Sequence, residues 1–227
     1  MATIEIEVDL RERFGPARDQ GPRPTCLAFA TSDNHAGLRA GWQPLSCEYL
    51  YFHAQRRAGR LPGQGAVLPA MLEALRGDGQ PVEAGWPYLD ASPPEGDAWK
   101  PPIEVGSCYG RVGVASQPDV SGVRSMLSLG HPIVVLSMLS RSFFRPVDGA
   151  VAPVPGEQPE PSQRHAVVAV GHGRVDGEPA TLVRNSWGPG WGLDGHAWLT
   201  DAFLAPRIFA TATLMEEVNV PSRAIAA

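Results

Sequence analysis

The hydrophobic pattern of this chain changes from helical to strand-like along its length, and this change limits the folds open to it. Thr25 to Ala40 lies between Pro24 and Gly41 and contains one internal glycine. This favours a helix that starts behind a proline and ends at a glycine. Residues 45–58 and 67–76 predict two further helices, and in the second the apolar residues recur at the 3.6-residue spacing of one helix face.

Strand-like segments follow in the second half of the chain. They are short, apolar and rich in β-branched residues, and comprise Pro132–Leu139, Ala166–Val170, Ala180–Val183 and Ala197–Leu199. Helices first and strands later are typical of an α+β fold. We therefore expect residues 1–227 to form one domain of two lobes, a helical lobe over about 15–105 and a β lobe over about 106–215. A cleft between such lobes is a natural place for a functional site.

Two proline-rich stretches interrupt these elements. Residues 91–102 contain four prolines and residues 146–161 contain five. Proline lacks the N–H that helices and central strands need. We therefore expect both stretches to be surface loops, and the second, which leads directly into His165, to restrict access to the site.

Composition excludes several classes of function. The formal charge is −5, so no excess of basic residues indicates binding to nucleic acid or an anionic membrane. The acidic N-terminus is unlike a signal peptide, and the longest apolar run, Pro132 to Leu139, is far shorter than the roughly 20 residues of a membrane span. The three cysteines, Cys26, Cys47 and Cys108, cannot all pair within one chain. A single Cys47–Cys108 bridge is the alternative, but we expect a cytoplasmic protein with three reduced thiols. We expect no metal site, because the His and Cys residues lack zinc-ligand spacing.

Cys26 is the strongest candidate for a nucleophile. A free thiol is only a few per cent ionised at pH 7, so a reactive cysteine needs a lowered pKa. A helix N-terminus and a nearby imidazolium both favour the thiolate. Cys26 opens the first predicted helix, directly after Pro22 and Pro24. The imidazolium must come from elsewhere in the chain, and His165, beside the strand Ala166–Val170, is the candidate.

The remaining parts of such a site follow two other segments. Asn185 comes after the strand-like run Thr181–Arg184. If the two strands are neighbours, Asn185 accepts a hydrogen bond from one imidazole nitrogen while Cys26 faces the other. Trp187 would then shield that bond from water. Gln20, six residues before Cys26, would donate its side-chain amide, together with the Cys26 N–H, to an oxyanion.

These segments resemble those of the papain family of cysteine peptidases. The nucleophile segment is similar over Asp19–Gly21 and Cys26–Ala30, and the histidine segment over His165–Gly173. The asparagine segment, Asn-Ser-Trp-Gly-Pro-Gly-Trp-Gly from Asn185, is the most distinctive. The residues appear in the family's order, Cys, His, Asn, and residues 65–88 also resemble its first lobe.

The resemblance implies a papain-like two-lobe fold, with a helical lobe, an antiparallel β-barrel-like lobe and the active-site cleft between them. It implies hydrolysis of peptide or protein substrates through a Cys26 thioester, without a cofactor or metal. The strongest preference would be for the residue two before the scissile bond. By position, Gly65 would offer backbone contacts to substrate, and Val67, Leu136 and Ala166 would line the pocket for that side chain. All are small or apolar, so we expect a hydrophobic residue there.

Three positions of the nucleophile segment depart from the family. Arg23 replaces its first cysteine, Pro24 the usual glycine and Leu27 the aromatic residue after the nucleophile. The loss of that disulfide agrees with a reducing compartment, whereas Pro24 removes an N–H where the chain lines the substrate cleft. Family members usually carry a long inhibitory N-terminal segment, and only a few residues precede these motifs here. We therefore expect a form without a propeptide.

Two other functions fit the same residues. An acyl transferase or peptide ligase would use the same thioester with an amine in place of water. A peptide-binding domain without catalysis would typically have lost Cys26, His165 or Gln20, and all three are present. The sequence does not indicate an oligomeric state.

Overall fold

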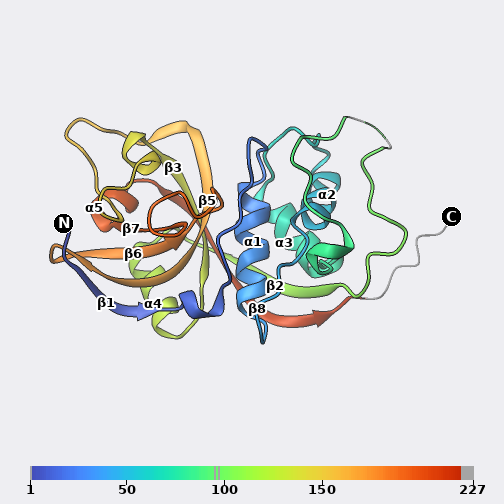
Figure 1. Cartoon of the computed structure of the whole chain (residues 1–227), viewed down its shortest axis with the longest axis horizontal. Coiled ribbons are helices and arrows are strands. Elements are labelled where there is room, and N and C mark those ends of the chain that lie inside the picture. Colours follow the sequence, from blue (N-terminus) through green and yellow to red (C-terminus); the bar gives the residue numbers. More distant parts are fainter. Residues whose placement is uncertain (1, 95, 97, 221–227) are drawn as a thin grey trace. The chain divides into compact units, whose positions relative to one another are not determined.

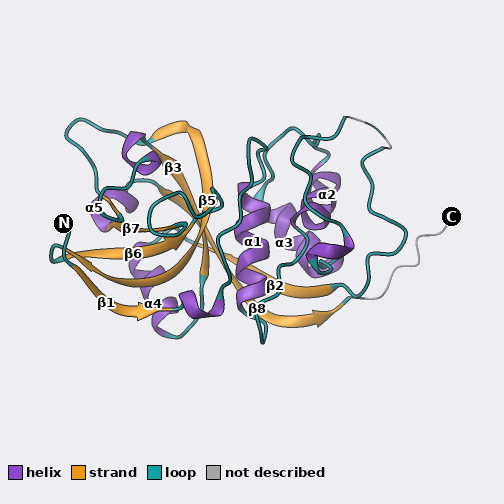
Figure 2. Cartoon of the chain, in the orientation of Figure 1, coloured by secondary structure: helices purple, strands orange, loops and turns teal. Residues whose placement is uncertain are grey.

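The computed structural model describes residues 2–94, 96 and 98–220, and these form two compact units. The strand unit consists of the described residues of Met1–Asp19 and Ser116–Thr213, and the helix unit of those of Gln20–Ala115 and Leu214–Ala227. The three longest helices belong to the helix unit, and β1, β3, β5, β6 and β7 belong to the strand unit (Figures 1 and 2).

The helix unit contains the three helices that the sequence predicts, α1 (Cys26–Gly37), α2 (Cys47–Ala58) and α3 (Leu68–Gly77). Local signals explain their ends. The Ser46 hydroxyl accepts a hydrogen bond from the Tyr49 N–H at the start of α2, and Gly59, with φ 60°, ends it in the left-handed conformation.

Helix α1 is the central helix of this unit. Every residue after Cys26 is buried, including polar ones. The Ser32 hydroxyl donates to the Leu45 carbonyl at 2.9 Å. The Gln80 amide nitrogen donates to the Ser32 oxygen at 2.9 Å, and the Gln80 amide oxygen accepts from His35 Nδ1 at 3.1 Å. Burial on all sides removes the apolar stripe of an amphipathic helix, so the start behind Pro24 identifies α1 better than its periodicity. The helix ends at Gly37, before the predicted end at Ala40.

Eight strands form one sheet within the described part of the chain. Its order is β2-β8-β3-β5-β6-β7-β4, and β1 pairs with β5. Strands β1, β3 and β6 each run antiparallel to β5, as do β3 to β8 and β6 to β7, whereas β4 runs parallel to β7. The strands are β1 (Ile4–Asp9), β2 (Tyr109–Ser116), β3 (Ile133–Leu139), β4 (Ala150–Val151), β5 (Glu160–Val175), β6 (Glu178–Arg184), β7 (His196–Thr200) and β8 (Ile208–Asn219). The four strands predicted from the sequence lie within β3, β5, β6 and β7, apart from the first residue, Pro132.

Several elements were not predicted. These are β1, β2, β4 and β8, the helices α4 (Val120–Ser128) and α5 (Asp201–Leu204), and the 3₁₀ turns Arg11–Arg13, Glu83–Gly85 and Arg141–Phe144. The strict alternation Ile-Glu-Ile-Glu-Val-Asp in β1 is a strand signal. Glycines on its partner make the pairing possible, because a Cβ at Gly173 would lie 2.1 Å from the Glu5 carbonyl oxygen.

The core of the strand unit is formed by β3, β5, β6 and β7 with α4 and α5. Its apolar cluster includes Val135, Val167, Val183, Leu199 and Phe203. Val151 also belongs to this cluster and is only 1% exposed. The expectation of a surface loop over 146–161 is therefore wrong in part: Ala150–Val151 pairs with β7, and β5 begins at Glu160. In the other proline-rich stretch, the described residues of 91–102 form no helix or strand.

Among the residues described, no helix is long and apolar enough to cross a membrane.

Candidate active site

A histidine–asparagine pair lies on neighbouring strands of the strand unit. His165 is in β5, opposite Ser137 of β3, and Asn185 directly follows β6. Strands β5 and β6 are antiparallel neighbours, with Val168 opposite Arg184. The sequence predicted that the His165 and Asn185 side chains would meet if these two strands were neighbours. His165 Nε2 and Asn185 Oδ1 are 2.6 Å apart.

The hydrogen bonds around Asn185 fix the proton on the histidine ring. The backbone N–H of Ser186 donates to Asn185 Oδ1 at 2.8 Å, so this atom is the amide oxygen and an acceptor. His165 Nε2 must therefore donate to it. In the neutral ring the other nitrogen, Nδ1, then carries a lone pair and can accept a proton.

Burial acts against a charge on this ring. His165 is 6% exposed. Burial lowers its pKa to about 4, while the hydrogen bond to Asn185 acts in the opposite direction. In these surroundings the imidazole is neutral near pH 7, and only a nearby negative charge would favour its protonated form.

Aromatic side chains surround the histidine. The Trp187 ring lies 4.7 Å from the His165 ring, measured between centroids, and the Phe143 ring lies at 5.8 Å. Phe144 stacks on Trp187 at 5.4 Å, and the Trp191 indole donates to the Phe143 carbonyl. The sequence indicated Trp187 as the shield of the His165–Asn185 bond, but not Phe143 or Phe144. The phenylalanines lie in a polar stretch, Arg-Ser-Phe-Phe-Arg, where no pattern indicates their role.

Cys26 is the first residue of α1 in the helix unit, as the sequence predicts. It is partly exposed, and all three cysteines are thiols. Cys47 is buried, and burial raises the pKa of Cys108. The helix start offers Cys26 the partial positive charge of unpaired backbone N–H groups.

Gln20, the predicted oxyanion donor, lies in the segment that leads to Cys26. Its side chain is nearly buried, and its amide donates to the Arg23 carbonyl at 2.8 Å. Asp19, the residue before Gln20, forms a β-bridge with Trp187 in the strand unit.

The four residues expected to bind substrate lie in two places, two of them before α3 and two on neighbouring strands. Gly65 is in the loop between α2 and α3, and Val67 is the N-terminal cap of α3 and 39% exposed. Leu136 and Ala166 are opposite each other on β3 and β5. Ala166 is buried, so it offers little surface beyond its backbone. The described residues contain no group of three His, Cys, Asp or Glu side chains placed to hold a metal ion.

A family model described as papain family cysteine protease matches residues 72–204, which is more than half of the chain. The chain belongs to the papain family. The matched range includes His165, Asn185 and Trp187, whereas Cys26 and Gln20 precede it.

Curated relatives and solved structures agree with this family. The chain is 24% identical to pro-cathepsin H of Bos taurus over 185 residues, an alignment that covers 80% of the chain. It is 28% identical to digestive cysteine proteinase 2 of Homarus americanus over 198 residues, which covers 84% of the chain. These alignments cover 54% and 59% of the two relatives, so the chain spans little more than half their length.

The papain-like fold itself is shown by the solved structures. Xylellain, a cysteine protease from Xylella fastidiosa, has a TM-score of 0.78 at 22% identity, covering 93% of this chain and 86% of that one. A cysteine protease from Carica candamarcensis has a TM-score of 0.67 at 20% identity, covering 92% and 97%. The α+β fold expected from the sequence is thus confirmed.

Proposed function

We propose that this papain-family chain is a cysteine-type peptidase with Cys26 as its nucleophile. The Cys26 thiolate attacks a peptide carbonyl, and the Gln20 amide and the Cys26 N–H bind the resulting oxyanion. His165 gives its proton to the leaving amine, which leaves a thioester. His165 then takes a proton from water, whose hydroxide releases the acid and restores the thiol.

The hydrogen bond between His165 and Asn185 carries this proposal. It holds the proton on Nε2, so Nδ1 is the nitrogen that exchanges a proton with the thiol. The surrounding aromatic rings limit access of water to that bond. Asn185 thus orients the ring through both halves of the reaction without gaining or losing a proton.

Burial of the His165 ring influences where the proton of the Cys26–His165 pair resides. A neutral imidazole alone is favoured here, since burial lowers the pKa of His165 to about 4. A thiolate beside the ring would favour the imidazolium, and the imidazolium would favour the thiolate. The proton can therefore reside on either the Cys26 sulfur or the His165 ring. This suits His165, which must both donate and accept a proton during the reaction.

A fluorogenic peptide assay with Cys26→Ala tests the proposal. We expect a loss of at least about 10³-fold in kcat/KM, because the nucleophile is removed. Cys108→Ala is the matched control, since Cys108 is also a partly exposed thiol, and it should retain activity. Equal activity in the wild type and Cys26→Ala would contradict the proposal. Product masses with a competing amine would distinguish hydrolysis from acyl transfer.

The substrate preference is part of the same proposal. Val67 and Leu136 are apolar, the first exposed and the second partly exposed, which supports a hydrophobic side chain two residues before the scissile bond. A peptide panel varied at that position should give its highest kcat/KM with Leu, Val or Phe. A preference for Arg or Asp would contradict it. We also propose a reducing, cytoplasmic location because all three cysteines are thiols; cell fractionation would test it.

A further inference from the structure

The hydroxyl of Tyr88 bonds to both ends of the segment that leads to Cys26. It donates to the Gln20 carbonyl at 2.7 Å and lies 2.8 Å from the Thr25 hydroxyl oxygen. A phenol has one proton, and the Gln20 carbonyl can only accept. The Thr25 hydroxyl must therefore donate to Tyr88. Burial raises the pKa of Tyr88, so its proton is retained near neutral pH.

This segment is also closed by a bond of its own. The Gln20 side-chain amide donates to the Arg23 carbonyl. Tyr88 thus fixes the Gln20 backbone, and the Arg23 carbonyl fixes the Gln20 side chain. Thr25, the third residue involved, is the N-terminal cap of α1 and immediately precedes Cys26.

Packing holds the Tyr88 ring in place. The Arg23 guanidinium carbon lies 4.8 Å from the ring centroid. The Phe29 ring of α1 meets it edge-on at 4.8 Å between centroids. The Tyr88 backbone N–H donates to the Glu83 carboxylate at 2.8 Å. The direction of the hydroxyl is therefore set by at least three neighbours.

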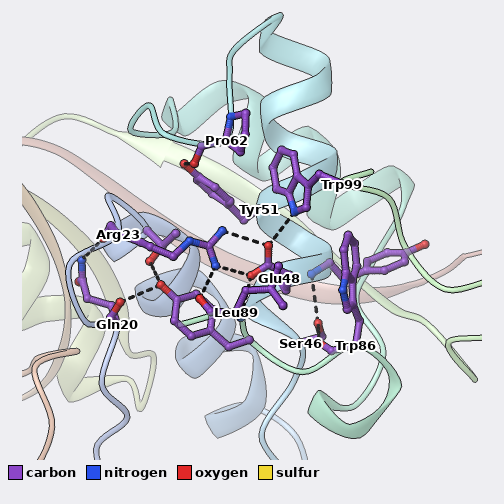
Figure 3. A network of polar contacts seen from close by, with 12 residues as sticks. Gln20, Arg23, Ser46, Glu48, Tyr51, Pro62, Trp86, Leu89 and Trp99 are labelled. Atoms are coloured by element: carbon purple, nitrogen blue, oxygen red, sulfur yellow. Dashed lines mark hydrogen bonds and ion pairs between the residues drawn. The ribbon is translucent and has the colours of Figure 1, made fainter. Parts of the chain in front are cut away.

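A buried ion pair anchors Arg23 (Figure 3). The side chains of Arg23 and Glu48 are 1% and 0% exposed. Two guanidinium nitrogens donate to the two Glu48 oxygens, at 2.5 and 3.0 Å, and Nη1 also donates to the Leu89 carbonyl. Glu48 accepts further bonds from the Trp99 indole and the Leu89 N–H. Partners on both charges offset the cost of burying them.

We infer that Tyr88 is a positioning residue: held by the Arg23–Glu48 pair, its hydroxyl sets the placement of Gln20 and of the start of α1. This inference rests on the proposed function, in which the Gln20 amide and the Cys26 N–H bind the oxyanion. Oxyanion donors act only when they lie at hydrogen-bond distance from the charge that develops. A displacement of about 1 Å in such a group costs up to about 10²-fold in rate.

Tyr88→Phe is the test, because it removes the hydroxyl and keeps the ring against Arg23 and Phe29. We expect kcat on a peptide substrate to fall about 10- to 100-fold, with KM changed less than about threefold, since the donors act in the transition state. Alkylation of Cys26 by iodoacetamide forms no oxyanion. Its rate should change by less than about threefold.

A double-mutant cycle separates positioning from a general loss of stability. Gln20→Ala alone should lower kcat by about 10²-fold. Adding Tyr88→Phe to Gln20→Ala should then cause a smaller further loss than Tyr88→Phe causes in the wild type, because one of the two oxyanion donors that Tyr88 positions is already absent. A merely structural role predicts that the two losses multiply.

Tyr51→Phe is the matched control. The Tyr51 hydroxyl is also buried, near the same guanidinium, but shares its one proton between the Pro62 and Gln64 carbonyls, at 3.0 and 2.5 Å. Tyr51→Phe should leave kcat within about threefold of the wild type. If Tyr88→Phe folds poorly, as judged by its Tm, Thr25→Val removes one of the two bonds with little change in shape. It should give a smaller loss of kcat with the same non-additivity.

The outcomes distinguish the inference from the function on which it rests. If Gln20→Ala loses activity and Tyr88→Phe matches the wild type, or if the losses multiply, the positioning role is overturned and the peptidase proposal stands. If the wild type neither hydrolyses peptides nor is alkylated at Cys26 faster than at Cys108, both are overturned.

Discussion

At the scale of single residues, the orientation of Asn185 decides the chemistry of His165. The Ser186 N–H bonds to Asn185 Oδ1, so the amide cannot turn its nitrogen to the ring without losing that bond. Because Asn185 Oδ1 faces the ring and can only accept, the His165 proton must be on Nε2. A backbone group next to Asn185 in sequence thus fixes the tautomer of a ring on another strand.

Asn185→Ala should therefore lower kcat by about 10- to 100-fold, because the imidazole loses the acceptor that orients it. KM should change little, since Asn185 is buried and bonds the ring. The fluorogenic peptide assay measures both constants. Asn219→Ala, at an exposed asparagine at the end of β8, is the control and should match the wild type. Unchanged kcat in Asn185→Ala would contradict the role given to Asn185.

The sequence predicted the His165–Asn185 bond because each residue adjoins a strand with a clear apolar pattern. It did not predict the contacts of Phe143, Phe144 or Tyr88. Each of these is far along the chain from the residue it contacts, and an isolated aromatic residue carries no signal of its partner. Local segments thus identify the candidate residues, and only the fold shows which side chains position them.

At the scale of elements, helices α1 and α3 were predicted from local signals such as Pro24 before α1 and Gly77 at the end of α3, although α1 ends at Gly37 and does not extend to Ala40 as expected. Strands β2 and β8 were not predicted, because they pair with each other across about 100 positions of the chain. The Arg111 side chain of β2 also donates to the Met215 carbonyl of β8. Strand β4 has only two residues and lies in a segment whose proline content predicts a loop. Pairing between distant residues, rather than composition, stabilises these strands.

The contact between β1 and β5 depends on glycine. We expect Gly173→Ala to lower the free energy of unfolding by about 1–3 kcal/mol, because its Cβ would overlap the Glu5 carbonyl oxygen of β1. Urea unfolding measures this. Gly190→Ala is the control, since a Cβ there meets no atom within 4 Å. Equal stability in the two variants would show that β1 is not packed against Gly173.

At the scale of the whole molecule, both units bury histidines in neutral form. Burial lowers the pKa of His35 in the helix unit to about 3. Burial, aided by the positive charge of Arg184, also lowers the pKa of His196 to about 4. The unfolded chain binds protons at these positions near pH 6.5, before the folded chain does.

Stability should therefore fall as the pH decreases from about 6.5 towards 4. Below pH 6.5 the unfolded state holds more protons, so each buried histidine removes up to about 1.4 kcal/mol per pH unit. Urea unfolding at pH 7.0 and 5.0 measures the loss. His35→Gln should reduce the difference between the two pH values, because one such proton-binding site is removed. A stability independent of pH in this range would contradict the account.

The most direct test of the central claim, a proton shared between Cys26 and His165, is an NMR titration of the His165 ring in the wild type and in Cys26→Ala. His165→Gln provides the assignment. In Cys26→Ala we expect the ring to titrate near pH 4, as burial dictates. In the wild type we expect it to stay protonated above pH 6.5, because the thiolate favours the imidazolium. The same titration near pH 4 in both proteins would contradict the claim.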